Sequence, residues 1–425
     1  MGQTMAEKIM SRKNVTGEPV KAGELIDANL DGLMVHISWS AVRAAYKKIG
    51  FEDGPPKVWD RDKFYLMIEH NQPPMNVNSA NANLDARRDA DRLDLKYFYD
   101  AEMGICHQMM VDYGHTRPGE LVVGTDSHTC MLGALNCAAT GIGAEEAAYS
   151  LAFGQLFFTV PESIKVVLNG KARAYPFAKD IILYLAGKYG DAFAQNQSIE
   201  FLGPMATAMD LADRMCLADH AVEVGAKFGL FTADKTATDF VETHTSVPFE
   251  PVAPDADADY VQEIVVDCDA LGFQVAKPYR FDNVSPLDEV IGTRIDQARI
   301  GSCANGRFED IEIAARMLKG RKVSPHVRFY ISPASMGVYK QCADAGLIGD
   351  LIEAGVHFQS PGCAICTSQV VLNEEVCITS TTRNSRGRFG GSTTVDSQAY
   401  IAGPATVAAA AIAGEIIDPR EILDA

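Results

Sequence analysis

Three cysteines on two segments of the chain have the residue type and the spacing of a metal-binding site. Cys363 and Cys366 form a Cys-x-x-Cys set behind a Pro-Gly pair, and Cys303 lies earlier, within Gly-Ser-Cys-Ala-Asn. Structural zinc sites and electron-transfer iron–sulfur clusters usually have four protein ligands. Three thiolates instead suit a metal site with one open position, where the metal can act as a Lewis acid. Our leading hypothesis is therefore a [4Fe–4S] cluster held by Cys303, Cys363 and Cys366.

The Cys-x-x-Cys set by itself fits two other kinds of site. A redox-active dithiol and one half of a zinc site both use this spacing in cytosolic proteins. A zinc site would need a second pair of cysteines, and none of the other cysteines is spaced as one. The residues that accompany the cysteines must decide between these alternatives.

Acidic and imidazole side chains follow several predicted strands. Glu69 and His70 end an apolar run, and Asp126 and His128 come directly after another; His107 lies in Gly-Ile-Cys-His-Gln. A carboxylate beside an imidazole sets the tautomer and the pKa of the histidine, as general acid–base catalysis requires. A capped turn beside a core histidine would explain Asp126 and His128 equally well.

Two arginines, Arg383 and Arg388, lie on a glycine-containing loop of a strongly acidic chain. Guanidinium groups bind carboxylates through paired hydrogen bonds, so this loop suits a substrate with several carboxylates. A solvated surface loop is the alternative interpretation.

Composition and charge exclude several classes of function. The chain has 425 residues and a formal net charge of -18, which predicts two to four domains and opposes binding to nucleic acid. No apolar run reaches the roughly twenty residues of a membrane span, and the N-terminus shows no signal peptide but a capping box, Thr4-x-x-Glu7. Ten irregularly spaced cysteines do not resemble a disulfide scaffold, so we expect a cytoplasmic protein.

Apolar runs, polar loops and helical segments alternate along the chain, which predicts an α/β fold with mostly parallel sheets and a site at the carboxyl ends of the strands. We expect three domains: 1–162, 163–284 and 285–425. Strands are predicted over 32–35, 64–68, 120–124, 164–170, 261–266, 295–300, 327–331 and 356–358. Helices are predicted over 41–49, 85–99, 134–157, 308–319, 336–345 and 404–414. A loop is predicted over 71–83, and Ser285-Pro286 is typical of a helix start.

Several motifs, in order, resemble the aconitase superfamily, and the resemblance covers nearly the whole chain. They are Gly-Thr-Asp-Ser-His-Thr over 124–129, Gly-Ser-Cys-Ala-Asn over 301–305, the Cys-x-x-Cys set, and Arg-Asn-x-x-Gly-Arg over 383–388. The pattern is similar to the large subunits of 3-isopropylmalate dehydratase, homoaconitase and 2,3-dimethylmalate dehydratase. The resemblance implies three α/β/α domains around a [4Fe–4S] cluster, without the swivelling fourth domain of full-length aconitases.

The resemblance also implies roles for individual residues. Glu69 and His70 would help to protonate a leaving hydroxyl group, and His107 would pair with Asp126. His128 would pair with Glu223. The remaining residues would bind the cluster or the substrate carboxylates: Cys303, Cys363 and Cys366 for the cluster, Asn305 beside it, and Arg383 and Arg388 for the substrate.

The expected activity is a hydro-lyase that isomerises a hydroxy di- or tricarboxylic acid, first of all 3-isopropylmalate. Because the catalytic base of full-length aconitases lies in the swivelling domain, the resemblance implies a separate small-subunit partner that supplies it. Departures from the family pattern are Glu69 for Asp, Asp219 and Thr382 for Asn, and Ile37 after His36. Homoaconitase and 2,3-dimethylmalate dehydratase are alternative activities, and a non-enzymatic cluster-bearing regulator is the alternative from another class.

Overall fold

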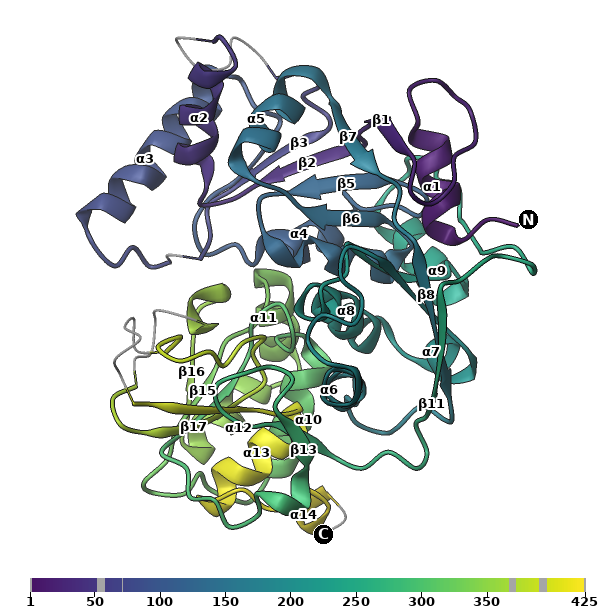
Figure 1. The fold of residues 1–425 in the computed structure, drawn as a ribbon. Coiled ribbons are helices and arrows are strands. Elements are labelled where there is room, and N and C mark those ends of the chain that lie inside the picture. Colours follow the sequence, from purple (N-terminus) through teal and green to yellow (C-terminus); the bar gives the residue numbers. More distant parts are fainter. Residues whose placement is uncertain (1, 52–57, 71, 367–371, 390–395, 424–425) are drawn as a thin grey trace.

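The computed structural model describes residues 2–51, 58–70, 72–366, 372–389 and 396–423. Within these residues the chain forms three larger sheets and one two-stranded sheet, with helices packed around them (Figure 1). The first helix, α1 (Met5–Lys13), opens with the predicted capping box, in which the Thr4 side chain accepts from the Glu7 backbone N–H. Among the described helices, none is both long and apolar enough to cross a bilayer.

The first sheet has five parallel strands in the order β4-β3-β2-β5-β6. Their bounds are Tyr97–Tyr99, Phe64–Met67, Gly32–Val35, Leu121–Gly124 and Ala138–Gly141. The central strands are buried on both faces, as parallel strands usually are. Leu33 and Val35 pack into the core under α2 (Trp39–Lys48) and α5 (Ala144–Phe153), whereas Met34 enters the core beneath α4 (Cys106–Asp112).

The second sheet is parallel, with strand order β10-β9-β8-β11. Its strands are Phe228–Phe231, Ser198–Leu202, Ser163–Asn169 and Gln262–Asp267. Helical segments of this section are α6 (Ala178–Tyr189), α7 (Pro204–Ala208), α8 (Leu211–Asp219), the 3-10 helix η2 (His220–Val224) and α9 (Lys235–His244). A separate antiparallel pair joins β1 (Leu25–Asn29) to β7 (Gln155–Thr159).

The third sheet has seven strands in the order β13-β12-β18-β17-β14-β15-β16. Their bounds are Val284–Pro286, Gln274–Ala276, Gln398–Ile401, Val376–Thr379, Gln297–Ile300, Arg328–Ile331 and Val356–Phe358. The five strands from β18 to β16 are parallel, and β12 is antiparallel to both its neighbours. The helices are α10 (Phe308–Leu318), α11 (Met336–Asp344), α12 (Leu347–Ala354), α13 (Pro404–Ala413) and α14 (Arg420–Leu423).

The predicted α/β class with mostly parallel sheets is confirmed. The proposed division at residues 162 and 284 stays a prediction; β12, which lies before residue 285, pairs with β18 of the third sheet.

Some predicted elements were wrong. The helix expected over 85–99 is α3 (Val77–Arg92) followed by strand β4, so α3 begins inside the predicted loop 71–83, of which residue 71 lies outside the described residues. The Asn76 side chain caps α3 by accepting from the Ser79 N–H, which explains why an asparagine-rich segment starts a helix.

The helix expected over 134–157 is divided among the end of η1 (Ser127–Leu135, a 3-10 helix), β6, α5 and β7. Asn136 and Gly154 have left-handed backbone conformations that end η1 and α5, so small-residue content alone did not predict these breaks. Pro286 ends strand β13, and only the short 3-10 helix Leu287–Glu289 follows it.

The backbone of η1 packs directly on strand β10 of the second sheet. A Cβ atom added at Gly133 would lie 1.9 Å from the Gly229 carbonyl oxygen. Because η1 also carries Asp126 as its N-cap and His128 within it, this contact fixes the acid–base residues against the second sheet.

Gly133→Ala should therefore destabilise the chain by about 3 kcal/mol, because backbone atoms cannot move aside as a flexible side chain can. The matched control is Gly272→Ala, since a Cβ added there meets no heavy atom within 4 Å. Denaturant unfolding followed by circular dichroism measures both. Equal stability of the two variants would contradict the close packing.

Candidate functional site

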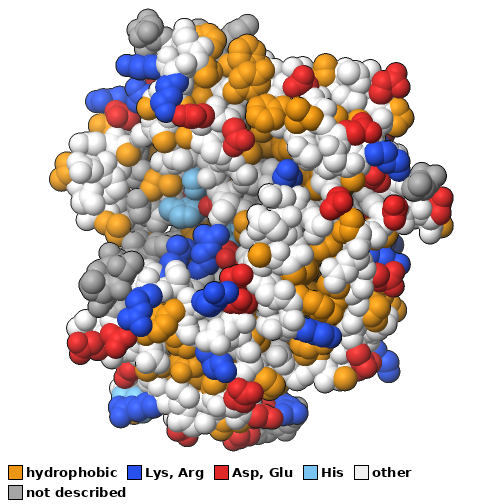
Figure 2. Space-filling view, in the orientation of Figure 1, with side chains coloured by type: hydrophobic (Ala, Val, Ile, Leu, Met, Phe, Trp, Pro, Cys, Tyr) orange, Lys and Arg blue, Asp and Glu red, His pale blue; other side chains and the backbone are white. Residues whose placement is uncertain are grey.

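The predicted site residues converge between the first and third sheets, in a hollow of the surface. Figure 2 shows histidine side chains at the bottom of this hollow and lysine or arginine side chains along its lower side. The histidines come from segments that follow β2, β3 and β5 and from the start of α4, whereas the cysteine loops belong to the third sheet. The site is therefore built by segments that are far apart in the sequence.

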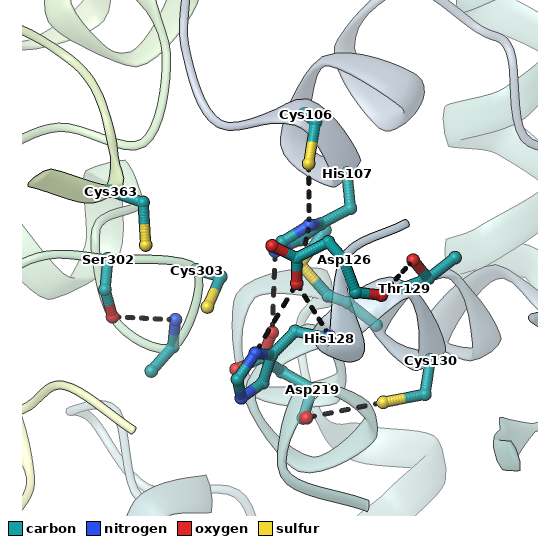
Figure 3. A network of polar contacts seen from close by, with 12 residues as sticks. Cys106, His107, Asp126, His128, Thr129, Cys130, Asp219, Ser302, Cys303 and Cys363 are labelled. Carbon is teal, nitrogen blue, oxygen red and sulfur yellow. Dashed lines mark hydrogen bonds and ion pairs between the residues drawn. The ribbon is translucent and has the colours of Figure 1, made fainter. Parts of the chain in front are cut away.

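The three cysteines lie together in one buried cluster with Ile105, Ala334 and Ile365. The Cys363 thiol donates to the sulfur of Cys366 at 3.3 Å, and both belong to the 3-10 helix η4 (Cys363–Cys366). Cys303 and Cys363 lie on one side of the site, and His107 and Asp126 lie on the other (Figure 3). The structure thus brings together the thiols that the sequence singled out.

Buried arginines hold the backbone of both cysteine loops. Arg307 donates to the carbonyl oxygens of Cys303 at 2.6 Å and Ala304 at 2.8 Å, and Arg299 donates to that of Ile365 at 3.0 Å. Gly301 and Ser302 have positive φ values of 153° and 72°, which turn the chain sharply before Cys303. These contacts fix where the thiols point.

The environment of Cys303 favours its thiolate. Burial alone would raise the pKa of this thiol. The neighbouring Cys363 thiol, followed by the rings of His128 and His107, outweighs burial and holds the pKa well below its usual range. Because metals bind the thiolate form, Cys303 suits a metal ligand.

The buried carboxylate of Asp126 is the centre of the acid–base residues. Its Oδ2 lies 3.4 Å from His36 Nε2 and 3.3 Å from His70 Nε2. Its Oδ1 accepts the backbone N–H of His128 at 2.7 Å and lies 4.0 Å from His107 Nδ1. Burial alone would raise the pKa of Asp126, but the hydrogen bonds from His128 and His36 hold it well below the usual range.

His70 is a charged imidazolium at neutral pH. Burial alone would lower its pKa, but the carboxylate of Glu69, which is hydrogen-bonded to His70 Nδ1, and the charge of Asp126 raise that pKa to about 10. His70 also has a left-handed backbone conformation, which is uncommon for a residue other than glycine. The strained backbone and the carboxylates on both sides hold a proton-bearing ring at the carboxyl end of β3.

His128, Glu223 and Arg383 form a second set of charges. Glu223 Oε1 lies 2.9 Å from His128 Nε2 and 2.7 Å from Arg383 Nε. Burial alone would raise the pKa of Glu223, but His128 and then Arg383 lower it to about 2. Arg383 Nη2 also donates to the Ser127 hydroxyl at 3.3 Å. The loop that carries Arg383 and Arg388, which we call the arginine loop, therefore reaches η1, the helix that carries His128.

His107 contacts two carboxylates. The resemblance pairs it with Asp126, and the structure places the two 4.0 Å apart; the Oδ1 of Asp219 lies closer to His107 Nε2, at 3.7 Å. Within the described residues, His107 Nε2 and both carboxylate oxygens of Asp219 are buried without a hydrogen-bond partner. Burial and the nearby Cys303 raise the pKa of Asp219 well above its usual range.

The two remaining predicted residues lie on the cysteine side of the site. The Asn305 side chain is buried and donates to Asp310 Oδ1 at 2.8 Å. Arg388 is half-buried, and its charge helps to lower the pKa of the Cys366 thiol, after the larger effect of the hydrogen bond from Cys363.

The sequence prediction missed two buried groups beside the site. His36, which directly follows β2, contacts Asp126, and its ring lies 4.9 Å from that of His70. Its place directly after a buried strand was the available signal. Lys179 had no such signal, because it lies inside a helix and reaches the site only through tertiary packing.

Comparison with known proteins identifies the family. The model of the aconitase family (aconitate hydratase) matches residues 75–293 and 288–414. The chain belongs to the aconitase family. It is 40% identical to "3-isopropylmalate dehydratase large subunit 1" of Methanopyrus kandleri, with 100% of both chains covered. It is also 40% identical to the probable methanogen homoaconitase large subunit of Methanosarcina mazei, over 93% of this chain and 100% of that one.

A solved structure supports the fold. The holo-form of Thermococcus kodakaraensis aconitase X aligns with a TM-score of 0.50 at 10% identity, covering 92% of this chain and 93% of that chain. The predicted aconitase-like fold is therefore confirmed for this member of the family.

The donor atoms of the site fit a metal centre with polar ligands around it. Besides the three thiols, sets of nitrogen, oxygen and sulfur atoms within 4.8 Å of one another could hold a metal ion: His36, Glu69, His70 and Asp126; Cys106, His107 and Asp126; His107, Asp219 and Cys303. Buried polar atoms are normally hydrogen-bonded. Glu69, His107 and Asp219 each have buried polar atoms without a hydrogen-bond partner in the described chain. These atoms fit the binding of a polar ligand beside the thiols.

Glu223→Gln should remove a pH-dependent part of the stability. Because the pKa of Glu223 is about 2 when folded and about 4.3 when unfolded, its ionisation stabilises the fold above the unfolded pKa. This contribution, on the order of 3 kcal/mol, is lost as the pH falls toward 2.

Denaturant unfolding of wild type and Glu223→Gln, repeated from about pH 7 down to about pH 3, measures this contribution. Wild type should lose stability faster than the variant below about pH 5. Glu421→Gln, at an exposed glutamate of α14, should keep the wild-type slope. Parallel pH profiles of wild type and Glu223→Gln would contradict the assigned pairing.

Proposed function

We propose that this chain is the large subunit of a [4Fe–4S]-dependent hydro-lyase that dehydrates and rehydrates a hydroxy di- or tricarboxylic acid in the cytoplasm. The observation that carries the proposal is the meeting of three buried thiols with the histidines around Asp126 and with Arg383 in one hollow. Among the proposed substrates, 3-isopropylmalate comes first because the relatives of Methanopyrus kandleri and Archaeoglobus fulgidus carry that name.

The three cysteines would hold the cluster. When bound, a [4Fe–4S] cluster with three cysteine ligands supplies an open iron that can polarise the hydroxyl and a carboxylate of the substrate. Asn305 follows Cys303 on the same loop, and its hydrogen bond to Asp310 fixes its side chain there.

His70 would supply the proton that leaves with the hydroxyl as water. It carries that proton at neutral pH because its pKa is about 10. Glu69 holds Nδ1, and Nε2 faces Asp126, so two carboxylates orient the ring and can stabilise it while it is charged. The His107 and His128 rings on the other side of Asp126 would complete the preformed field around the reacting atoms.

Arg383 and Arg388 would bind the substrate carboxylates. Glu223 accepts from Arg383 Nε and the Ser127 hydroxyl accepts from Nη2, so within the described residues Nη1 and the second hydrogen of Nη2 would be the donors for a carboxylate. Arg388 lies near Cys366 and would direct a second carboxylate toward the cysteines. A dicarboxylate bound in this way would lie between the thiols and the histidines.

The carbon-bound proton would be taken by a base on a separate small subunit. The curated relatives are named as large subunits, which implies a partner for this chain as well. Proton removal from carbon and loss of the protonated hydroxyl together give the alkene and water. Readdition of water at the neighbouring carbon would complete an isomerisation.

A homoaconitase activity is the second candidate, because the Methanosarcina mazei relative of that name is as similar as the first. Of the residues that depart from the family pattern, Glu69, Asp219 and Thr382 are buried and Ile37 is half-buried; Glu69 and Asp219 lie at the site. We propose no role in nucleic-acid binding, which the net charge of -18 opposes.

The decisive experiment is anaerobic co-purification with the small subunit and assay against a panel of hydroxy acids. We expect turnover of 3-isopropylmalate or homocitrate by the complex and none by the large subunit alone, because the proposed base lies on the small subunit. An RNA filter-binding assay of the same preparation is the control for the regulator alternative. Turnover without the partner, or RNA binding without any turnover, would contradict the proposal.

Cys303→Ser should abolish cluster assembly, because a hydroxyl is a far weaker ligand for iron than a thiolate. Iron and acid-labile sulfide, counted per chain after anaerobic reconstitution, should fall to background levels, as should the visible absorbance of the cluster. The matched control is Cys342→Ser, at another buried cysteine that lies in α11. Normal iron and sulfide in Cys303→Ser would exclude this residue as a ligand.

A further inference from the structure

A buried lysine outside the assigned residues connects two segments of the site. Lys179, in the first turn of α6, is 1% exposed, although lysine is almost never fully buried unless it is paired. Its Nζ lies 2.7 Å from His220 Nε2, 2.9 Å from the Ser380 carbonyl oxygen and 3.4 Å from that of Thr381. The ammonium group is therefore surrounded by three acceptors and holds all three in place.

The direction of the bond to His220 follows from the other side of the ring. His220 Nδ1 donates to the Cys216 carbonyl oxygen at 2.7 Å, so in the neutral ring Nε2 is the acceptor. Burial and the charge of Lys179 lower the pKa of His220 well below its usual range, which keeps the ring neutral. Lys179 is thus the donor to His220.

The acceptors belong to the two segments that carry one ion pair. His220 begins η2, and Glu223 lies in the same short helix. Ser380 and Thr381 directly follow β17 and precede Arg383 on the arginine loop. Glu223 and Arg383 meet at 2.7 Å. The Lys179 ammonium group therefore links the two segments that carry the Glu223–Arg383 ion pair. It bonds to the His220 ring near Glu223 and to the backbone near Arg383.

We propose that Lys179 is a positioning residue. It keeps the arginine loop where Arg383 pairs with Glu223, and thereby determines where Arg383 can bind a substrate carboxylate. This inference rests on the proposed function, in which Arg383 binds that carboxylate. Without Lys179, two buried carbonyl oxygens and the His220 ring lose their donor, and the start of the arginine loop is free to shift. Small displacements of a charged binding group have large effects on substrate binding.

Lys179→Met tests the proposal, because methionine keeps the length and apolar stem of lysine but donates no hydrogen bond. We expect KM for whichever hydroxy acid the complex turns over to rise about tenfold, a change of about 1.4 kcal/mol, with a smaller change in kcat. Lys179→Arg, which keeps donors and charge, should recover part of the loss. The control is Lys188→Met on the exposed side of the same helix, where Lys188 donates to Tyr184.

A double-mutant cycle separates positioning from general structural damage. Kinetics of wild type, Lys179→Met, Arg383→Lys and the double variant, each with the small subunit, give the coupling between the two residues. If Lys179 acts through Arg383, Lys179→Met should change KM by less than about twofold once Arg383 has been replaced. Independent, multiplicative effects on KM would overturn the proposal, as would an unchanged KM in Lys179→Met.

A second variant keeps the test decisive if Lys179→Met does not fold. His220→Phe removes one of the three acceptors and leaves Lys179 in place; the same cycle with Arg383→Lys should again show coupling, and its absence would overturn the proposal. Inactivity of the wild-type complex on every hydroxy acid would instead refute the proposed function and remove the basis of this inference. If the wild-type complex is active and Lys179→Met has the same KM, the role of Lys179 is refuted and the proposed function stands.

Discussion

The buried carboxylate of Asp126 is the interaction on which the rest of the site depends. A buried charge is costly unless it is paired and hydrogen-bonded, and this one is contacted by His128 of its own segment and by histidines from three other segments. Those segments must therefore converge whenever Asp126 is ionised. The same carboxylate caps the 3-10 helix η1 that follows β5, because it accepts the His128 backbone N–H.

The charges of the site form two linked groups. Glu69 and His70 lie on one side of Asp126, and His128, Glu223 and Arg383 lie on the other. Positive and negative groups alternate through both, so each buried charge has an opposite neighbour in a poorly hydrated interior. The three thiols lie beside these groups, and buried arginines hold their loops by donating to the carbonyl oxygens of Ile365 and Cys303.

Much of this arrangement could be predicted from the sequence, and the failures have physical reasons. Buried parallel strands were recognised because their residues are apolar without interruption, and Glu69, Asp126 and Cys303 because each follows such a strand. The prediction of one helix over 134–157 was wrong because left-handed residues at Asn136 and Gly154 interrupt a segment whose composition favours a helix. Lys179 and the contact between His107 and Asp219 depend on packing between distant segments, which no local pattern records.

The two halves of the site come from different sheets, with the histidines on the first and the cysteines on the third. Neither half contains the other's residues, and contacts of such large sequence separation form late in folding, since loop closure must precede them. The complete site therefore forms only after both sheets have folded and packed together. A substrate can contact the thiols and the imidazoles at the same time only in the folded chain.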